Sequence, residues 1–303
     1  MTAVIQTDRL TKAYGNHRGI VEIDLDVQHG EVFGFLGPNG AGKTTTIRIL
    51  LDLIRPTSGR ATVFGIQTDL DPVAIHRRVG YLPGEFTLYD RLTGDQNLQY
   101  FANLRGGVDR AYQAQLVARF DFDPSRRFRE YSKGNKQKVG LIVALQHRPE
   151  LLILDEPTSG LDPLVQRTFF EVMREAVADG RTVFLSSHVL SEAEKTCDRV
   201  AIIRDGRLVR IDRVDALRDL AAHEVELRFT GPVPVEPFTA LAGVSRVSAE
   251  DHVLRMHVTG SIDPVVKAAA VYSLTDFISR EPSLEETFLA EYGREVVPAA
   301  GRE

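Results

Sequence analysis

The chain has 303 residues, of which 43% are hydrophobic, so it can bury a large core and form more than one domain. Its formal net charge is −5 and its acidic and basic residues are interspersed, which argues against nucleic acid as a partner. The single cysteine, Cys197, excludes an intramolecular disulfide framework and suits a reducing compartment.

Residues 1–10 lack the basic segment and apolar stretch of a secretory signal, so we expect the protein to stay in the cytoplasm.

The first predicted elements are strands. Residues 5–10 are a predicted strand, and residues 21–27 alternate apolar and acidic side chains, as a half-solvated strand does. Further short strands are predicted at 61–64 and 79–82.

Residues 37–44, GPNGAGKT, follow the apolar run 32–36 and match the phosphate-binding pattern G-x-x-x-x-G-K-[ST] at every fixed position. The glycines allow turns that point backbone N–H groups inward, and a helix predicted over 44–51 directs its N-terminal dipole to the same point. A glycine-rich turn that binds nothing is the alternative. The loop predicts a site for a nucleoside polyphosphate and Mg²⁺, formed by Gly37, Pro38, Asn39, Gly40, Ala41, Gly42, Lys43, Thr44 and Thr45.

Within this loop, three side chains have distinct expected contacts. Lys43 supplies a positive charge for the β- and γ-phosphates, the Thr44 hydroxyl can ligate Mg²⁺, and Thr45 can reach the α-phosphate.

Helix signals and apolar strands alternate along the rest of this region. Residues 151–154, 183–185 and 200–203 are uniformly apolar, as buried parallel strands are. Residues 86–131 have helical periodicity without a strand and predict a helical insertion, with the helical subdomain at about 86–147. The pattern predicts an α/β fold with a mixed sheet. Helix starts are predicted at Asp71 with Pro72, at Thr93 with Gln96, at Asp162 with Pro163 in a helix that Gly180 ends, and at Ser191 with Glu194.

Two adjacent carboxylates end the predicted strand at 151–154. Asp155 fits Mg²⁺ coordination, directly or through water. Glu156 can polarise a water for in-line attack on a γ-phosphate, which is a general-base role. An acidic turn before Pro157 is the alternative, but the position of the pair after Lys43, with a helical stretch between, favours a metal and base site.

The sequence pattern changes after about residue 220. Strands at 225–229 and 252–258, a proline-rich connection, and helices near 264–270 and 284–292 predict a small α+β domain. We therefore expect a nucleotide-binding domain at 1–220 and an accessory or regulatory domain at 221–303.

With these motifs in place, the chain resembles the nucleotide-binding subunit of ATP-binding cassette (ABC) transporters over residues 4 to about 215. The resemblance implies a P-loop ATPase cassette that uses ATP and Mg²⁺, with Lys43, Glu156 and His188 as catalytic residues. Residues 131–135, YSKGN, look like the family signature L-S-G-G-Q. Ser132 is a predicted N-cap for a helix to about residue 147, whose free N–H groups can hold a γ-phosphate.

In this family that phosphate lies on the opposing subunit. The resemblance therefore implies a head-to-tail homodimer with two shared ATP sites, in which Ser132, Lys133, Gly134 and Asn135 contact nucleotide. Tyr14 stands where the family has an adenine-stacking aromatic residue, Asp162 ends the loop that crosses the dimer interface, and His188 matches the switch histidine that contacts the γ-phosphate. Each alone is a weak signal, and Asp162 is also an ordinary helix cap, but their order and spacing favour function.

Two positions depart from the family pattern. Gly84 follows Tyr-Leu-Pro where the family has a glutamine that links Mg²⁺ and the attacking water to the membrane partner. Glu85 or a water can take that place, and we include Glu85 among the metal candidates. Lys133 and Asn135 replace the usual glycine and glutamine of the signature, so slow hydrolysis is expected at a site that is still active.

The domain order, with the segment SLEETFL near the C-terminus, is similar to ATPase subunits of bacterial drug and antibiotic exporters of the daunorubicin-resistance type. This resemblance implies integral membrane permease subunits as partners and a place on the cytoplasmic face of the membrane. The alternatives are a soluble mechanical ATPase of translation, repair or cluster assembly, an importer ATPase, and a regulatory switch without hydrolysis. The presence of Glu156 argues against the last of these.

Overall fold

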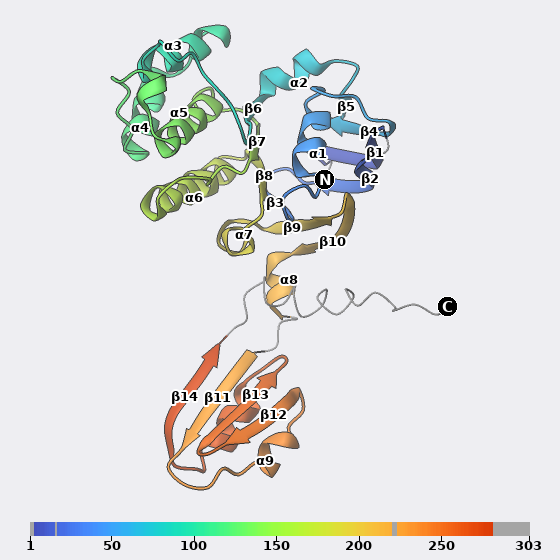
Figure 1. The fold of residues 1–303 in the computed structure, drawn as a ribbon, viewed down its shortest axis with the longest axis vertical. Helices are drawn as coiled ribbons and strands as arrows, with labels where there is room; N and C mark the ends of the chain where they lie inside the picture. Colours follow the sequence, from blue (N-terminus) through green and yellow to red (C-terminus); the bar gives the residue numbers. More distant parts are fainter. Residues whose placement is uncertain (1–2, 16, 220–222, 281–303) are drawn as a thin grey trace. The chain divides into compact units, whose positions relative to one another are not determined.

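A computed structural model describes residues 3–15, 17–219 and 223–280 of the chain (Figure 1). The chain divides into two compact units, Met1–Asp212 and Arg213–Glu303. Each unit has its own hydrophobic core, formed by residues between Val4 and Ile203 in the first and between Val225 and Ala269 in the second.

The first unit is built from helices and strands that alternate after the N-terminal hairpin. Its elements, in chain order and including the strand that crosses the unit boundary, are β1 (Ile5–Tyr14), β2 (His17–Val27), β3 (Val32–Leu36), α1 (Lys43–Leu50), β4 (Ser58–Val63), β5 (Ile66–Gln67), α2 (Pro72–Arg78), β6 (Val79–Leu82), α3 (Gly94–Leu104), α4 (Arg110–Arg119), a 3₁₀ turn (Phe128–Glu130), α5 (Lys133–Leu145), β7 (Leu151–Asp155), α6 (Pro163–Ala178), β8 (Thr182–Ser187), α7 (Leu190–Thr196), β9 (Arg199–Arg204) and β10 (Arg207–Arg213).

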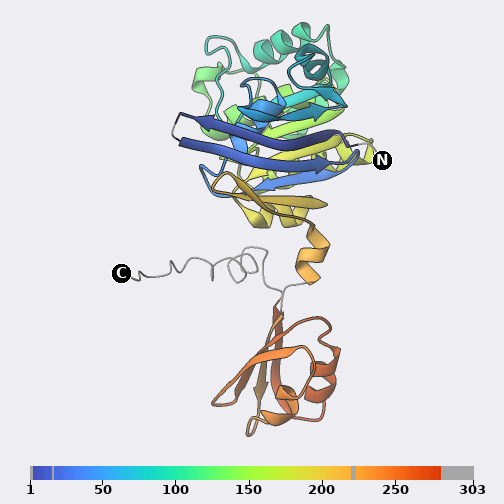
Figure 2. The same cartoon turned by 90° about the vertical axis from the view of Figure 1, so that its right-hand side faces the viewer.

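Two sheets form the first unit. A six-stranded sheet has the order β10-β9-β3-β8-β7-β6, in which the pairs β9–β3, β3–β8, β8–β7 and β7–β6 are parallel. Strands β3, β7 and β8 are buried along their whole length, which explains their uniformly apolar sequences. A second, antiparallel sheet has the order β2-β1-β4-β5, and its blue strands cross the front of the unit in Figure 2. The predicted α/β fold with parallel and antiparallel strands is confirmed.

The helical insertion consists of α3, α4 and α5, which gather as one lobe in Figure 1. Helix α5 packs against α3, α4 and strand β6. Aromatic side chains fill the space around it, and four of them are buried: Phe120, Phe122, Phe128 and Tyr131. The predicted helical insertion is therefore confirmed.

Side-chain caps fix several helix starts, as predicted. Asp71 caps α2, the pair Thr93 and Gln96 forms a full capping box at α3, and Asp162 caps α6 through the N–H groups of Leu164 and Val165. The box predicted at Ser191 with Glu194 was wrong. Helix α7 begins at Leu190, after Val189, and has no side-chain cap. The reason lies upstream, because the Ser187 hydroxyl accepts a hydrogen bond from the Val189 N–H at 3.0 Å and sets the preceding turn.

The second unit contains a sheet that buries one set of side chains against helices α9 and α10. Its elements are α8 (Val214–Asp219), β11 (His223–Phe229), α9 (Glu236–Thr239), β12 (Val244–Glu250), β13 (Val253–Val258), α10 (Asp263–Ala269) and β14 (Leu274–Arg280). The strands form an antiparallel sheet in the order β12-β13-β11-β14. Alternate residues of β11 and β13 bury against Phe238 of α9 and Val265 of α10. The strands predicted at 225–229 and 252–258 and the helix at 264–270 are confirmed.

Some C-terminal predictions were incomplete. Strands β12 and β14 were not predicted, because most of their residues are exposed and they lack a clear apolar alternation. The helix predicted at 284–292 lies outside the described residues.

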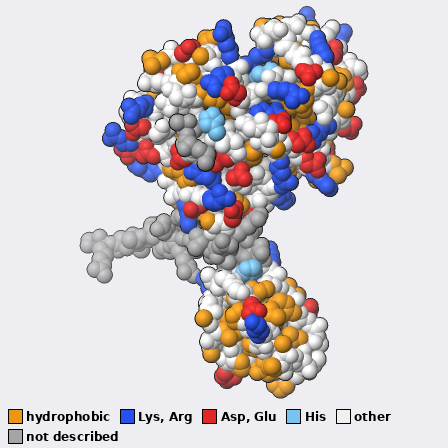
Figure 3. Space-filling view, turned by 180° about the vertical axis from the view of Figure 1, so that it is seen from behind, with side chains coloured by type: hydrophobic (Ala, Val, Ile, Leu, Met, Phe, Trp, Pro, Cys, Tyr) orange, Lys and Arg blue, Asp and Glu red, His pale blue; other side chains and the backbone are white. Residues whose placement is uncertain are grey.

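The surface shows no single basic stripe on the face drawn in Figure 3, where basic and acidic side chains are interspersed. Over the described ranges, none of the helices is both long enough and apolar enough to cross a bilayer.

Because each unit buries its own core, we expect residues 1–220 to fold without the second unit. The fragment should show helical and sheet circular dichroism and a single cooperative thermal transition. A fragment that lacks cooperative unfolding while the full chain keeps it would contradict the division into independent units.

Candidate functional site

Three loops meet at the carboxyl edge of the parallel sheet. Strand β3 ends at Leu36, β7 at Asp155 and β8 at Ser187. The register pairs Leu36 with Ser187 and Asp155 with Ser186, so the loops that follow these strands begin side by side. The crevice beyond the carboxyl ends of parallel strands is the usual place for ligands in α/β folds.

The loop between β3 and α1 is a cradle of backbone groups. Gly40 and Gly42 have φ angles of 82° and 110°, in the left-handed region that favours glycine. The N-cap residue of α1 is Gly42, which provides no side-chain cap, so the helix start presents its N–H groups to the loop. Such a helix start is suited to an anion.

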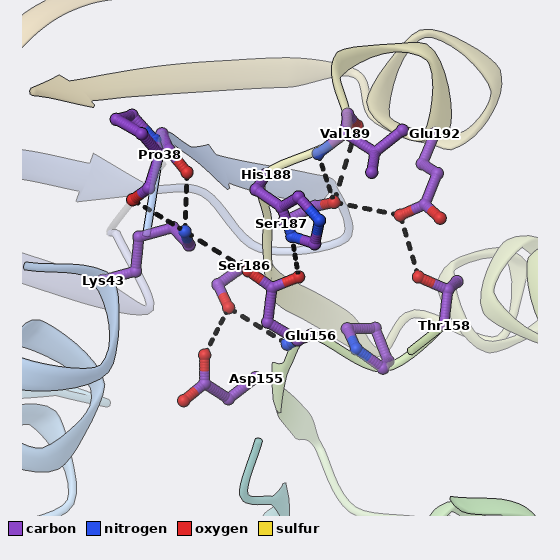
Figure 4. A network of polar contacts seen from close by, with 12 residues as sticks. Pro38, Lys43, Asp155, Glu156, Thr158, Ser186, Ser187, His188, Val189 and Glu192 are labelled. Atoms are coloured by element: carbon purple, nitrogen blue, oxygen red, sulfur yellow. Dashed lines mark hydrogen bonds and ion pairs between the residues drawn. The ribbon is translucent and has the colours of Figure 1, made fainter. Parts of the chain in front are cut away.

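Lys43 is 5% exposed, and its ammonium group lies back in this loop. Its Nζ donates hydrogen bonds to the carbonyl oxygens of Gly37 at 2.6 Å and Pro38 at 3.2 Å. It also lies 3.2 Å from Oε1 of Glu156. The charge of Lys43 is thus held between its own loop and Glu156, which follows β7 (Figure 4).

Asp155 is 1% exposed and accepts two hydrogen bonds. Its Oδ2 accepts from the Thr44 hydroxyl at 2.7 Å, and its Oδ1 accepts from the Ser186 hydroxyl. Burial is the main cause that raises the pKa of Tyr81 to about 12, and the negative charge of Asp155 adds to it. The phenol therefore stays neutral beside the carboxylate.

The donor set at Thr44 and Asp155 suits Mg²⁺, a hard cation that prefers carboxylate, hydroxyl and phosphate oxygens. Within the described parts of the chain, no group of three or more His, Cys, Asp and Glu side chains could hold a metal. A cation at this point would therefore take its remaining ligands from phosphate oxygens and water. Glu85, the further candidate, lines the same cavity as Thr44 and Asp155.

Glu156 lies between a cation and an imidazole. Its Oε2 is 2.7 Å from Nδ1 of His188, and its Oε1 faces Nζ of Lys43 but accepts no hydrogen bond although it is buried. The Glu156 φ angle is 51°, uncommon for a residue other than glycine, and its N–H bonds to the carbonyl oxygen of Ser186 at 3.2 Å. Because of this turn, the adjacent carboxylates of Asp155 and Glu156 point in different directions and contact different partners.

Two cavities border these groups. One, of about 520 Å³, is lined by Thr44, Asp155, Glu156 and His188, together with Gly84, Glu85 and Lys133. The other, of about 310 Å³, is lined by Tyr14 and by loop and helix residues that include Gly40, Lys43, Thr44 and Thr45. Tyr14 is 45% exposed, so its ring is accessible from the second cavity. The structure thus brings most of the sequence-predicted site residues to one place.

The residues of the signature motif, 132–135, mostly lie outside the two cavities. Ser132 caps α5 by accepting from the Asn135 N–H at 3.3 Å, and Gly134 lies so close to Gly160 that a Cβ would meet its carbonyl oxygen at 2.6 Å. Of residues 132–135, only Lys133 lines either cavity. Asp162 lines neither of them, and its pKa is lowered by the hydrogen bonds from the Val165 and Leu164 N–H groups.

Several neighbours of the site escaped the sequence analysis. Arg48 and Tyr81 line the larger cavity, and Ser186 holds Asp155. Gln137 of α5 donates to the carbonyl oxygen of Pro157 at 2.9 Å and so ties the signature helix to the Glu156 loop. Arg48 follows Lys43 by five residues in the same helix, which was a usable signal, but the role of Gln137 depends on a long-range contact that no local pattern encodes.

Comparison with known proteins shows the family of this chain. Residues 20–159 match the family model described as ABC transporter. The chain is 40% identical over 214 residues, 69% of each chain, to the bacitracin transport ATP-binding protein BcrA of Enterococcus faecalis. It is 34% identical over 302 residues, 94% of each chain, to the daunorubicin resistance ATP-binding protein DrrA2 of Streptomyces coeruleorubidus.

A solved structure of an ABC transporter subunit is also similar to this chain. The ATP-binding subunit of an ABC transporter is 32% identical, has a TM-score of 0.65, and covers 71% of this chain and 92% of its own. The range that matches the family model contains both the loop at 37–44 and the carboxylates Asp155 and Glu156. This chain belongs to the family of ABC transporter ATP-binding proteins.

Proposed function

We propose that this chain is the Mg²⁺-dependent ATPase subunit that powers an ABC exporter of drugs or antibiotics. The observation that carries the proposal is the convergence of Lys43, Thr44, Asp155, Glu156 and His188 at one edge of the sheet. The named relatives serve bacitracin transport and daunorubicin resistance, and the second of them matches over 94% of this chain, the C-terminal unit included.

Nucleotide binding uses the loop and the smaller cavity. The free N–H groups at the start of α1 and the Lys43 ammonium would hold the phosphates, and Tyr14 would stack on the adenine. Phosphate oxygens would compete with Gly37 and Glu156 for the Lys43 ammonium. Binding of ATP would therefore release Oε1 of Glu156 from its cation.

Hydrolysis then depends on the freed carboxylate. A water oxygen attacks the γ-phosphorus, the bond to the β–γ bridging oxygen breaks, ADP leaves, and the water proton passes to Glu156. His188, 2.7 Å from Oε2 of Glu156, would orient this carboxylate and contact the γ-phosphate with its other ring nitrogen. Thr44 and Asp155 would hold Mg²⁺, which supplies positive charge against the phosphates.

The proposed working form is a head-to-tail homodimer attached to integral membrane permease subunits, at the cytoplasmic face of the membrane. Ser132, Gly134 and Asn135 line neither cavity of their own chain, which supports a role at the site of a partner copy. Closure on ATP and reopening after hydrolysis would move the permease. The C-terminal unit would tune dimerisation or docking.

Substitution of Lys43 and of Glu156 should give different defects. Lys43→Ala removes the charge that faces the phosphates and should weaken ATP binding and abolish turnover. Glu156→Gln keeps the shape but loses the base, so ATP should still bind while phosphate release falls by about 100-fold or more. A fluorescent ATP analogue measures the first property and phosphate release the second. Wild-type hydrolysis by Glu156→Gln would remove this residue from the mechanism.

Gly84 generates a second prediction. A Cβ at this position would lie 3.3 Å from Oδ2 of Asp155, and the side chain would extend into the 520 Å³ cavity. Gly84→Gln should raise hydrolysis by the isolated chain several-fold, because the amide can position the attacking water, whereas Gly84→Ala should not. Equal activity of the two variants would show that the missing amide does not limit the rate.

The isolated chain should be a weak ATPase, because Ser132, Gly134 and Asn135 line neither cavity of their own chain and a net charge of −5 on each copy opposes association. Its co-encoded membrane protein in lipid should stimulate turnover strongly. Steady-state hydrolysis measured across protein concentration, without and with that protein, tests this. A full rate without the membrane protein and no effect of adding it would favour a soluble ATPase.

A further inference from the structure

Glu192 of helix α7 joins two loops of the site through one oxygen atom. Its Oε2 accepts a hydrogen bond from the Thr158 hydroxyl at 2.8 Å and another from the Ser187 hydroxyl at 2.9 Å. Thr158 lies two residues after Glu156, and Ser187 directly precedes His188. Figure 4 shows this bridge on the far side of His188 from Lys43.

The two donors are buried and depend on this carboxylate. Thr158 is 6% and Ser187 1% exposed. The Ser187 oxygen accepts from the Val189 N–H at 3.0 Å. Its own proton has two acceptors in reach, Oε2 of Glu192 at 2.9 Å and the Val189 carbonyl oxygen at 3.5 Å, and the shorter contact is the one to Glu192. Buried hydroxyl groups that lose their partner are destabilising, because no water replaces it. The bridge is therefore a specific tie between the loops.

A second tie joins the same loops but uses the reacting groups. Nδ1 of His188 lies 2.7 Å from Oε2 of Glu156. On the proposed function, on which this inference rests, Glu156 also faces a water and His188 also faces a phosphate, so both ends of this contact belong to reacting groups. Thr158, Ser187 and Glu192 line neither cavity, and their contacts can persist when nucleotide is bound.

We propose that Glu192 is a positioning residue for ATP hydrolysis, which keeps the Glu156 loop and the His188 loop in register independently of the His188–Glu156 contact. It touches no substrate. Gln137 holds the Glu156 loop from the signature helix through the carbonyl oxygen of Pro157, and Glu192 holds it from the side of His188. The loop that carries Glu156 is thus fixed at two points.

The test uses the full chain and single-turnover phosphate release at saturating Mg·ATP, with ATP affinity measured separately. Glu192→Ala should slow the chemical step by about 10- to 100-fold, as misplacement of a reacting group does, and change the ATP Kd by less than about twofold. Glu192→Gln keeps a carbonyl oxygen that can accept both hydroxyl protons, so it should recover most of the rate. Glu171→Ala removes a carboxylate from the exposed Arg167–Glu171 pair of α6 and serves as the matched control.

A double-mutant cycle separates positioning from general loss of structure. Thr158→Val removes one donor with little change in volume and should slow the step as well, and its effect should be strongly non-additive with that of Glu192→Ala. A wild-type rate in Glu192→Ala, additive effects, or an equal loss of rate and affinity that Gln does not rescue would each overturn the proposal. If one of these results is found and the Glu156→Gln variant is inactive, only the role of Glu192 is overturned and the proposed function stands. If the Glu156→Gln variant is active, the proposed function itself is overturned.

Discussion

The buried carboxylate of Asp155 is the constraint on which the site depends. An ionised group that is 1% exposed needs strong hydrogen-bond donors, and Asp155 finds them in Thr44 at the start of α1 and Ser186 at the end of β8. These bonds connect the phosphate loop, β7 and β8, the three segments that carry the remaining reactive groups. The parallel register places the donors opposite the acceptor, so fold and site are determined together.

The contact between Lys43 and Glu156 is one that a bound phosphate can replace. Lys43 is bound to two loop carbonyl groups and faces a buried carboxylate oxygen that accepts no hydrogen bond. Phosphate oxygens carry charge, which the Gly37 and Pro38 carbonyl groups do not, so they can form charge-assisted hydrogen bonds with this cation. The exchange of Lys43 from protein to phosphate would both bind the nucleotide and free the base. Binding and chemical activation would thereby be coupled through a single side chain.

The sequence predicted those parts of the fold that short-range patterns encode. The phosphate loop, the Thr93 capping box and the apolar strand before Asp155 depend on residues that are close in the chain, and the structure contains all three. The start of α7 was mispredicted because the Ser187 hydroxyl, outside the helix, fixes the turn before it. The contacts of Glu192 with Thr158 and of Gln137 with Pro157 gave no local signal, since these residues lie 34 and 20 positions apart in the chain.

The central claim is that ATP binds at the carboxyl edge of β3, β7 and β8 and takes Lys43 away from Glu156. A crystal structure of the chain with Mg²⁺ and a non-hydrolysable ATP analogue tests it most directly. The account predicts that Nζ of Lys43 contacts the β- and γ-phosphates, that Glu156 no longer contacts Lys43, and that Thr44 and Asp155 lie at the metal. A nucleotide bound elsewhere, or Lys43 still paired with Glu156 beside bound phosphates, would contradict it.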